Sequence, residues 1–532
     1  MTHYFIGVGG TGARCAEACV YLAAAGIISG DLHFLIIDPD ANNGNASAAE
    51  SLLTYYYLIH GEAQPQNPQF RRGKIRAAFS GAKAPAAVLF QPSINRDGED
   101  PCLWNVQQRN SRHFTDVVKY ASCPPKLRSF IDLFYQSNDM NMRLEVGYQG
   151  RTNVGAVALK QDLEETKNAL GGGLREFLTA LVGDLQNGEA RVFVAGSVFG
   201  GTGAAGIPTL PALLNGLDDR TLPAAQRANL KWGCALMAPY FIFPRNRSAG
   251  AERLGPGTDS TRHPVATQAA LLHYAQTPPG YQNIYFLGAP HRGQTNEENF
   301  PGGNQQKNLP HYAELSAALA AWDFYNLDSK SVHLEARKLH YADSYDNGND
   351  LGVSWETLPV NLAESARKRS LVKQRLITFT TFAYVYRRIL HNEFVSNRSY
   401  RNSDMYKDNF GGLDMEGYPQ EQALVALSSF CENYLEWLSG IGRTGGTSLP
   451  VLFNWNALAA RQLAQCEQYA GNLIETGAQR APRYSNNGYQ KIMERLNQIR
   501  LDTPQTQSAV GLFIYLLHEA VSEFCQENYD LR

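Results

Sequence analysis

The sequence lacks an excess of charge of either sign. Its 532 residues contain 48 Lys and Arg against 50 Asp and Glu, which gives a formal net charge of −2. A chain without a strong net charge has no long-range attraction for the phosphates of nucleic acids or for anionic membrane surfaces. We therefore expect no nucleic-acid partner.

Long apolar runs are also missing. No stretch approaches the roughly 18 apolar residues that a membrane-spanning helix requires. The first predicted strand begins by about His3, which leaves no room for a secretory leader. The eight cysteines are scattered, and Cys15 and Cys19 lie one helical turn apart rather than in a C-x-x-C pair. These features predict a cytoplasmic protein with no membrane span and with buried, reduced thiols.

Two common catalytic signatures are absent as well. The chain has no GxxxxGK[ST] segment and no HExxH segment, and its twelve histidines show no close metal-ligand pairing. The sequence therefore excludes a P-loop lysine and the zinc site of the HExxH hydrolases.

Strand and helix patterns alternate through the first part of the chain. Short apolar runs such as YFIGVG, LHFLIID and ARVFVAGSV are typical of strands that are buried on both faces of a parallel sheet, and amphipathic helical stretches separate them. After about residue 330 the strand signal fades and helical periodicity dominates. We predict an α/β fold with a doubly wound parallel sheet over residues 1–330, followed by a mainly α-helical domain over residues 331–532.

A glycine-rich loop follows the first predicted strand. Residues 7–12 read Gly-Val-Gly-Gly-Thr-Gly and fit G-x-G-x-x-G between a strand and a helix. Glycines let the backbone approach a phosphate, which the N–H groups and the helix dipole can then hold. We expect Gly9, Gly10, Thr11 and Gly12 to contact a phosphate; the alternative is a tight turn in a well-packed domain.

Two acids follow the second predicted strand, in IIDPDANNGN. Asp38 or Asp40 at this position could hydrogen-bond a ribose or help to organise a metal ion, although Asp and Asn are also common turn and cap residues. Up to this point three classes fit the chain: an oxidoreductase that uses nicotinamide or flavin, an adenylating enzyme that activates small carrier proteins, and a tubulin-type nucleotide-binding protein.

A second loop of the same kind separates these classes. VFVAGSVFGGTGAAGIPTLPALL reads as a strand, a glycine loop and a helix, with Gly200, Gly201, Thr202 and Gly203 in the loop. A plain dinucleotide-binding domain needs one such loop. Two loops on neighbouring strands can hold one polyphosphate from both sides, because each offers N–H groups and a helix N-terminus.

With both loops, residues 1–330 resemble the tubulin superfamily, including the bacterial cell-division tubulin homologue. FGGTGAAGIP is similar to the GGGTGxG signature loop of that superfamily, GVGGTG to the opening loop of its bacterial members, and IIDPDA to their second-strand segment. The resemblance places Asp40 near a metal ion. It also places Arg247, beyond the segment Ala238-Pro239-Tyr240-Phe241, at a nucleotide contact.

The chain departs from that family at several positions. Phe243 stands where a ribose-binding acid is expected, and Ala13 and Arg14 follow the first loop where the family has an asparagine. Glu314 in PHYAELSAAL is the candidate counterpart of the residue that reads guanine; the alternative is an ordinary solvated helix residue. The acids after that helix, which are Glu335, Asp343, Asp346 and Asp350, form no readable catalytic loop.

The resemblance implies a bound GTP or GDP with Mg²⁺ that controls self-association into a filament or oligomer, or the binding of a protein partner by the helical domain. GTP hydrolysis stays open because no catalytic acid can be located. Leu144–Ala156, with Arg151, is a candidate third phosphate-binding segment. The alternatives are a Rossmann-type enzyme, adenylating or NAD-dependent, that uses only the first loop, and a scaffold with an empty pocket.

Overall fold

The structure is a computed structural model. It describes residues 2–40, 42–63, 94–95, 103–105, 113–144, 147–166, 172–216, 223–242, 263–277, 279–288, 293–294, 303–328, 332, 338–342, 345–346, 349–350, 355, 366–391, 422–444, 452–475, 481–499 and 509–531.

A parallel sheet forms the centre of the first part of the chain. Its strands are β1 (Thr2–Val8), β2 (Asp31–Asp38), β3 (Ile94–Asn95), β4 (Leu103–Asn105), β5 (Ala190–Ser197), β6 (Leu230–Met237), β8 (Asn283–Leu287) and β10 (Lys338–Ala342). The strand order is β10-β8-β6-β5-β1-β2-β3, and β4 also pairs with β2. β1 runs parallel to both β2 and β5, so that Val8 lies opposite Ile37 and Gly196.

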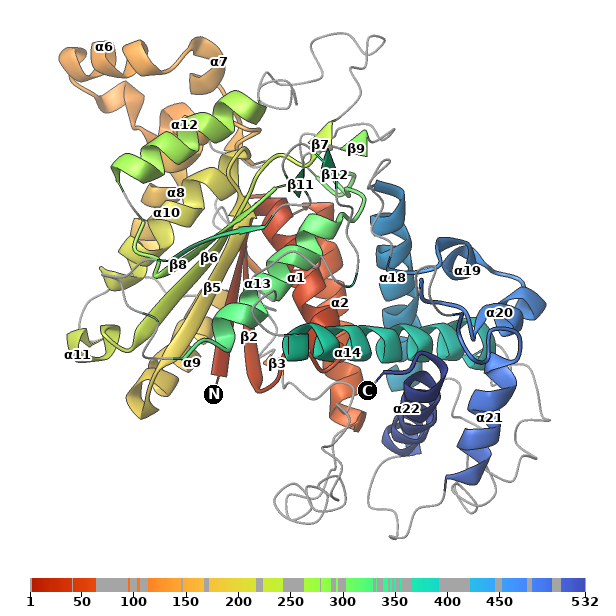
Figure 1. Ribbon diagram of the computed structural model, residues 1–532. Helices are drawn as coiled ribbons and strands as arrows, with labels where there is room; N and C mark the ends of the chain where they lie inside the picture. The colour runs from red at the N-terminus through yellow and green to blue at the C-terminus, as the bar shows by residue number, and fades with distance from the viewer. Residues whose placement is uncertain are drawn as a thin grey trace. The chain divides into compact units, whose positions relative to one another are not determined.

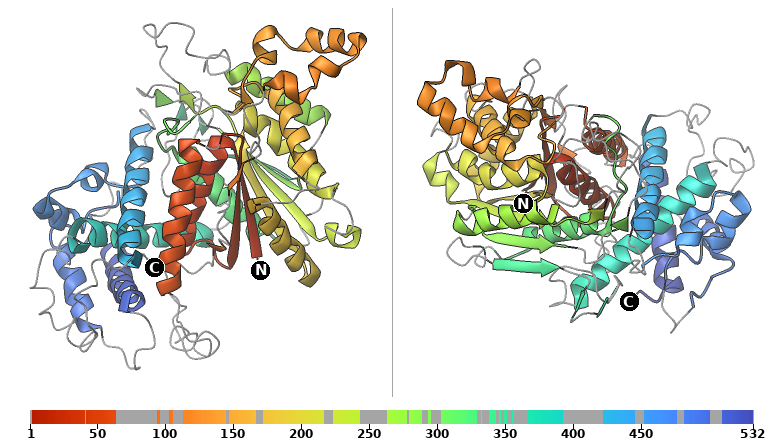
Figure 2. Two further views of the ribbon diagram at one scale, coloured as in Figure 1. Left: turned by 180° about the vertical axis from the view of Figure 1, so that it is seen from behind. Right: turned by 90° about the horizontal axis from the view of Figure 1, so that it is seen from above.

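Helices cover both faces of this sheet (Figures 1 and 2). One face carries α1 (Gly9–Ala24), α2 (Gly44–Ala63) and α13 (Tyr312–Tyr325), and the other carries α8 (Thr152–Thr166), α9 (Gly172–Asn187), α10 (Gly201–Asn215) and α12 (His263–Gln276). The predicted doubly wound α/β fold is confirmed. Gly26, with φ of 74°, follows the end of α1 at Ala24.

Alternate strand residues build the two cores. Tyr4, Ile6 and Val8 of β1 pack into one large cluster with residues of α8, α9 and α10, while Phe5 points to the opposite face. Because both sides of β1 and β5 are buried, these strands read as continuous apolar runs rather than alternating ones.

The first part also contains shorter elements. They are α5 (Phe114–Val117), a 3-10 turn (Tyr120–Ser122), α6 (Pro125–Phe134), α7 (Ser137–Met140), α11 (Ala224–Arg227), and the short strands β7 (Phe241–Ile242), β9 (Gly293–Gln294), β11 (Tyr345–Asp346) and β12 (Asn349–Asp350).

The last part of the chain is helical in its described residues. It contains α14 (Ala366–Tyr384), which continues as a π-helical turn (Val385–Leu390), and α18 (Gln422–Thr444), α19 (Trp455–Ala459), α20 (Leu463–Tyr469), α21 (Gly488–Gln498) and α22 (Ala509–Asn528). α14 packs against both α18 and α22. A helical C-terminal region was predicted and is confirmed.

The chain divides into two compact units. Unit 1 comprises Met1–Cys19, Asp31–Ser51 and Asn95–Asn349, and unit 2 comprises Val20–Gly30, Leu52–Ile94 and Asp350–Arg532. This division differs from a single boundary after residue 330, because the end of α1 from Val20 and the part of α2 from Leu52 belong to the same unit as the C-terminal helices.

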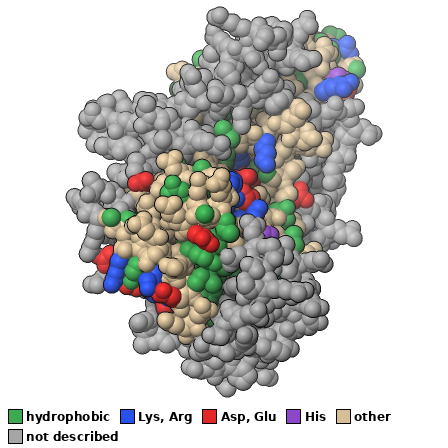
Figure 3. Space-filling view, turned by 90° about the vertical axis from the view of Figure 1, so that its right-hand side faces the viewer, with side chains coloured by type: hydrophobic (Ala, Val, Ile, Leu, Met, Phe, Trp, Pro, Cys, Tyr) green, Lys and Arg blue, Asp and Glu red, His purple; other side chains and the backbone are tan. Residues whose placement is uncertain are grey.

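The cysteine side chains agree with the sequence prediction. Seven cysteines in the described part of the chain are free and buried, as the sequence predicted. Within the same residues, none of the helices combines the length and apolar character needed to cross a membrane. On the face drawn in Figure 3, acidic and basic side chains both occur among hydrophobic ones.

Candidate functional site

The first glycine loop is the turn from β1 into α1. Gly9 has φ of 72°, a left-handed conformation that glycine adopts without strain. A Cβ on Gly12 would lie 2.6 Å from the carbonyl oxygen of Ala195 and 2.6 Å from the carbonyl carbon of Gly7. Gly9 therefore makes the turn possible, and Gly12 lets α1 pack directly on β1 and β5.

The second glycine loop is built in the same way at the end of β5. Gly200 is the N-cap of α10, in extended backbone conformation. A Cβ on Gly203 would lie 2.4 Å from the carbonyl oxygen of Ser197, and one on Gly201 would lie 2.7 Å from Cβ of Tyr148. These glycines bring the first turn of α10 close to the strand and to the Tyr148 segment.

The two loops meet each other. A Cβ on Gly9 would lie 3.2 Å from Cβ of Thr202 and 3.6 Å from the backbone nitrogen of Gly203. Thr11 and Thr202 are only partly buried. The unpaired N–H groups of two helix N-termini are thus gathered at one place, where each terminus contributes roughly half a positive charge.

The loops also flank the switch point of the sheet. From β1 the chain passes through α1 to β2 on one side, and from β5 it passes through α10 to β6 on the other side. The two helices accordingly lie on opposite faces (Figure 1). In open α/β sheets, ligands bind beyond the carboxyl ends of the strands at such a point, because the diverging connections leave a crevice there.

The predicted acids Asp38 and Asp40 stand beside the first loop. A Cβ on Gly10 would lie 3.0 Å from Nδ2 of Asn45 and 3.2 Å from Nδ2 of Asn43. Asp38 is buried and accepts hydrogen bonds from the Asp40 amide (3.0 Å) and from Nδ2 of Asn43 (3.0 Å). The β2–α2 connection therefore places polar side chains, those of Asp38, Asp40, Asn43 and Asn45, next to the N-terminus of α1.

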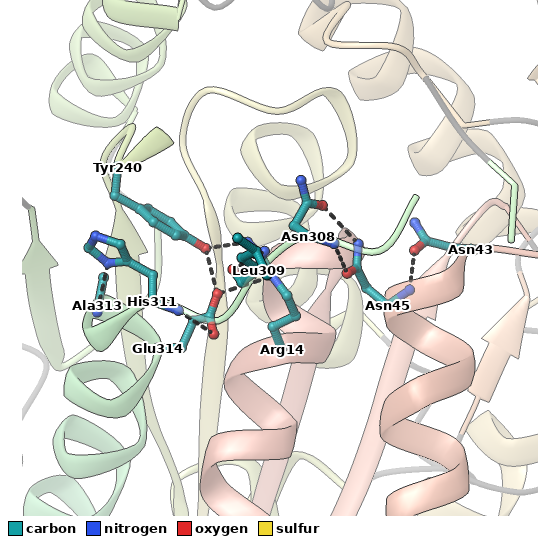
Figure 4. Close-up of polar contacts among 9 residues, drawn as sticks. All are labelled: Arg14, Asn43, Asn45, Tyr240, Asn308, Leu309, His311, Ala313 and Glu314. Carbon is teal, nitrogen blue, oxygen red and sulfur yellow. Dashed lines mark hydrogen bonds and ion pairs between the residues drawn. The ribbon is translucent and has the colours of Figure 1, made fainter. Parts of the chain in front are cut away.

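Residues 303–309 pack against the polar side chains of the β2–α2 connection. The amide of Gly303 donates to Oδ2 of Asp40 (2.6 Å). Asn45 and Asn308 exchange two hydrogen bonds, one from Nδ2 of Asn45 (3.2 Å) and one from the Asn308 amide (3.1 Å), as Figure 4 shows. Nδ2 of Asn43 also donates to Oε1 of Gln306 (3.0 Å).

The carboxyl group of Asp38 has a raised pKa. Burial raises the pKa of Asp38 to about 7, and the neighbouring charge of Asp40 acts in the same direction, whereas the hydrogen bonds from Asp40 and Asn43 oppose the shift. Part of the Asp38 population is therefore neutral near pH 7, which reduces its repulsion of an anion at the glycine loops.

Asp40 can contribute to a Mg²⁺ site. Its two carboxylate oxygens accept from the Asn42 and Gly303 amides, and each oxygen retains a second lone pair. Among the described residues no group of three or more His, Cys, Asp and Glu could hold a metal ion. One carboxylate together with phosphate oxygens and water is nevertheless an ordinary Mg²⁺ environment.

Glu314 lies in the first turn of α13 and is fully buried. One of its oxygens pairs with Nε of Arg14 (3.1 Å) and accepts from the Tyr240 hydroxyl (3.2 Å), and the other accepts from the His311 amide (3.2 Å). Figure 4 shows these side chains pointing toward one another. Glu314 is therefore engaged with side chains of its own chain, and it is not a solvated helix residue.

The electrostatics of this cluster are dominated by burial. Burial raises the pKa of Glu314, and the charge of Arg14 opposes that shift. Burial and the same Arg14 charge lower the pKa of His311 to about 3, so the imidazole is neutral and its Nδ1 accepts from the Ala313 amide (3.1 Å). The cluster ties α1, α13 and the segment after β6 together.

Leu144–Ala156 also reaches the second loop. Gly147 and Gly150 have positive φ, and the Gly150 nitrogen would lie 3.2 Å from a Cβ on Gly201. Nε of Arg151, however, pairs with Oδ1 of Asp139 at 2.8 Å. The backbone of this segment therefore borders the second loop, while the Arg151 side chain pairs with α7.

Several predicted residues lie outside the described part of the chain. They are Arg247, Phe243, Glu335 and Asp343, and for Asp346 and Asp350 only the backbone is described. Their predicted roles stay predictions.

Sequence reasoning missed the partners on residues 303–311. The cluster Asn42-Asn43-Gly44-Asn45 was visible beside Asp40, but nothing in NQQKNLPH signals that Gln306, Asn308 and His311 lie against it. Tyr240 was noticed only as part of a proline-aromatic segment, and its bond from Arg14 has no local signal in the sequence.

No protein-family model, curated protein or solved structure matches this chain. The functional interpretation therefore depends on the motifs and on the geometry of the switch point.

Proposed function

We propose that the two glycine loops at the β1–β5 switch point bind a guanine nucleotide, GTP or GDP, together with Mg²⁺. The observation that carries the proposal is the meeting of the N-termini of α1 and α10, at which Gly9 and Thr202 are in near contact. The phosphates would accept from the backbone N–H groups of residues 9–12 and 200–203, and Thr11 and Thr202 would add hydroxyl contacts.

The β2–α2 connection, which carries Asp38 and Asp40, has a defined part in this proposal. Asp40 would hold Mg²⁺ directly or through water, and the ion would neutralise phosphate charge beside the carboxylates. Asp38 stabilises the β2–α2 connection by accepting hydrogen bonds from the Asp40 amide and from Asn43. The choice of Asp40 for Mg²⁺ rests on the resemblance, because Asp38 and Asp40 are both buried and each accepts two hydrogen bonds from protein donors.

The choice of guanine rests on the resemblance of both glycine loops to those of tubulin-like proteins. We assign Glu314 no contact with the base, because its carboxylate is fully buried and forms an ion pair with Arg14. We propose further that the bound nucleotide controls self-assembly or the binding of a protein partner. Hydrolysis is not assigned, since no catalytic acid is located among the described residues.

The decisive experiment tests the two loops separately. We expect Thr11→Glu and Thr202→Glu each to weaken the binding of GDP and Mg²⁺ at least tenfold in calorimetric titrations, because a carboxylate in the first turn repels phosphate. The same carboxylate is favourable for the helix dipole, by about 0.3–1 kcal/mol, so ligand-free Thr202→Glu should keep its melting temperature. The Thr11 side chain also hydrogen-bonds Tyr240, so the binding of Thr11→Glu is compared at a temperature at which circular dichroism shows the variant to be folded. Substituting Gly201 would be a poorer test, because its Cβ would clash with Tyr148.

Gln186→Glu is the matched control. It adds the same charge at an exposed position of α9 and should leave binding unchanged. If Thr11→Glu abolishes binding and Thr202→Glu does not, the single-loop Rossmann-type enzyme replaces our proposal, and NAD, a flavin or ATP is the ligand to titrate. If the unmodified protein binds no nucleotide, the protein is a scaffold that holds none, and the proposal fails. Equal affinity for ADP and GDP would overturn the guanine assignment alone.

A further inference from the structure

Three arginines of unit 2 converge on one carboxylate. Nε of Arg387 and Nη1 of Arg388, both in the π-helical turn after α14, lie 2.8 Å and 2.7 Å from Oε2 of Glu432 on α18. Nη2 of Arg461, between α19 and α20, lies 3.8 Å from Oε1 of the same carboxylate. The π-helical turn packs against α18 and α20, and α18 packs against α19 (Figure 1). Segments that are distant in the sequence therefore build this arginine cluster.

The arginine cluster holds more positive than negative charge. Three guanidinium groups share one carboxylate, which leaves a formal excess of two positive charges. The next acids along α18 and α20 are Glu436 and Glu467, and neither forms an ion pair with these arginines in the part of the chain that the structure describes. Because an unbalanced buried charge is costly, the cluster favours a bound anion.

The guanidinium group of Arg388 has donors without an acceptor. Its side chain is 6% exposed, and its Nη1 donates to Glu432 (2.7 Å). Nε and Nη2 of the same group are buried and have no hydrogen-bond partner in the described structure. Buried polar groups of folded proteins normally have such partners, so these two nitrogens are available to an oxygen ligand.

The guanidinium groups are close enough to repel one another. Burial lowers the pKa of Arg388, the charge of Glu432 opposes that shift, and the charges of Arg461 and Arg387 add to it. The exposed fraction of the side chain rises from 6% at Arg388 to 27% at Arg387 and 51% at Arg461. The cluster therefore opens to solvent beside Arg461, and an anion has to be small to reach Arg388.

We propose that Arg387, Arg388 and Arg461 bind the phosphate group of a small molecule, either inorganic phosphate or a phosphate monoester, while Glu432 holds one nitrogen of each arginine in place. A phosphate monoester carries about −1.5 to −2 charges at pH 7, which balances the excess, whereas one carboxylate balances half of it. Its terminal oxygens also match the forked donors of arginine. This inference does not depend on nucleotide binding at the glycine loops.

The backbone of the cluster agrees with a binding role. A π-helical turn is rare in proteins and occurs frequently at functional sites. Here it spans Val385–Leu390 and carries two of the three arginines as neighbours in the sequence, both in contact with Glu432.

Calorimetric titration of the full chain with inorganic phosphate tests the proposal. Arg387→Gln and Arg461→Gln should each raise the dissociation constant at least tenfold, because each removes a charge and its charge-assisted hydrogen bonds. Both side chains reach solvent, so the variants should keep the circular dichroism spectrum of the parent protein. Arg483→Gln is the matched control, since Arg483 is also an exposed arginine of unit 2 that pairs with a glutamate, Glu527. It should leave phosphate binding unchanged.

Two further titrations identify the ligand class. Glycerol 3-phosphate separates the two sources of the phosphate group, and the more tightly bound of it and inorganic phosphate is the better model of the natural ligand. Succinate also carries two negative charges but no tetrahedral group, and it should bind at least tenfold more weakly than phosphate. Equal affinities for succinate and phosphate would overturn the assignment of a phosphate group.

Chemical modification of the parent protein locates the anion without any substitution. Phenylglyoxal reacts with accessible guanidinium groups, and peptide mass spectrometry measures each arginine separately. Phosphate should slow the modification of Arg387 and Arg461 several-fold and leave that of Arg483 unchanged.

Three results would overturn the proposal. They are a phosphate dissociation constant above about 1 mM, binding that both arginine variants leave intact, and modification that phosphate does not slow. Phosphate binding that only Thr202→Glu abolishes would place the anion at the glycine loops instead. Loss of nucleotide binding alone would leave the proposal standing.

Discussion

At the scale of single residues, Asp38 makes folding depend on pH. Its folded pKa of about 7 exceeds the ordinary value of about 3.9 in an unfolded chain. The folded state therefore binds this proton more tightly, and the contribution to stability is complete below about pH 4 and is lost as the pH rises through 7. Three pKa units correspond to at most about 4 kcal/mol.

We expect Asp38→Asn to remove this dependence. Between pH 5 and pH 8, the unfolding free energy measured in urea should fall more for the parent protein than for the variant, because the amide cannot ionise. Asp31→Asn, at the exposed start of the same strand, should keep the slope of the parent protein. Parallel curves for the parent protein and Asp38→Asn would show that the Asp38 carboxyl keeps an ordinary pKa.

Residues whose role depends on their neighbours in the sequence were easier to predict than residues whose partners lie far away in the chain. Gly9 and Gly12 are required by the strand-to-helix turn itself, so their positions follow from local spacing. Glu314 was placed on the correct helix, but its partners Arg14 and Tyr240 come from elements far away in the chain. Local patterns carry no information about such pairs, because only the packing of α1 against α13 brings them together.

At the scale of elements, α10 contains two prolines that buried tyrosines compensate. Pro208 and Pro211 lack the N–H groups that would donate to the carbonyls of Ala204 and Ile207 in a regular helix. The hydroxyl of Tyr274 donates to Ala204 (2.7 Å), and that of Tyr281 donates to Ile207 (2.6 Å). The two carbonyls that the prolines leave open are therefore satisfied from α12 and from the segment that follows it.

We expect Tyr281→Phe to lower the unfolding free energy by about 1–3 kcal/mol, because it leaves a buried carbonyl without a donor. In a Pro211→Ala background the restored helical N–H should reduce that cost, which a double-mutant cycle measures. Tyr274→Phe should remain costly in the same background, since its carbonyl belongs to Pro208. Equal costs of Tyr281→Phe in both backgrounds would contradict this pairing.

Element types were mostly predictable, and breaks inside helices were not. β5 and α10 follow the predicted strand and helix of residues 192–214 closely. The helical periodicity of residues 455–469 is instead divided between two helices, α19 and α20, with Ala460 in extended conformation between them. No glycine or proline marks this break, so periodicity alone continues through it.

At the scale of the whole molecule, the chain is interleaved between its two units. The strand patterns predicted a boundary near residue 330, but Val20–Gly30 and Leu52–Ile94 belong to unit 2. Hydrophobic periodicity shows that α1 and α2 are helices, yet it cannot show what each part of a helix packs against. This is why the fold class was predictable and the division of the chain was not.

Aromatic contacts show which side chains the N-terminal segments contribute to the core of unit 2. The ring of Tyr21 packs against Phe430, Tyr434 and Trp437 at 5.0–5.5 Å between centroids, and Tyr56 lies 6.1 Å from Phe430. All five side chains are buried. A fragment that ends at residue 349 would expose Tyr21 and Tyr56, and a fragment that begins at residue 350 would lack them.

We therefore expect neither fragment 1–349 nor fragment 350–532 to fold alone, whereas the full chain should unfold with its two units coupled in one calorimetric transition. Each removed aromatic contact costs about 0.5–1.5 kcal/mol beyond the area that it buries, and several are lost together. The measurement is calorimetry and near-ultraviolet circular dichroism of the three proteins. A full-length Tyr21→Ala variant serves as the matched comparison, because it removes the Tyr21 contacts without cutting the chain and should melt at a lower temperature. A soluble fragment 1–349 with a cooperative transition would contradict this prediction, because it would show that the α/β unit folds without residues 350–532.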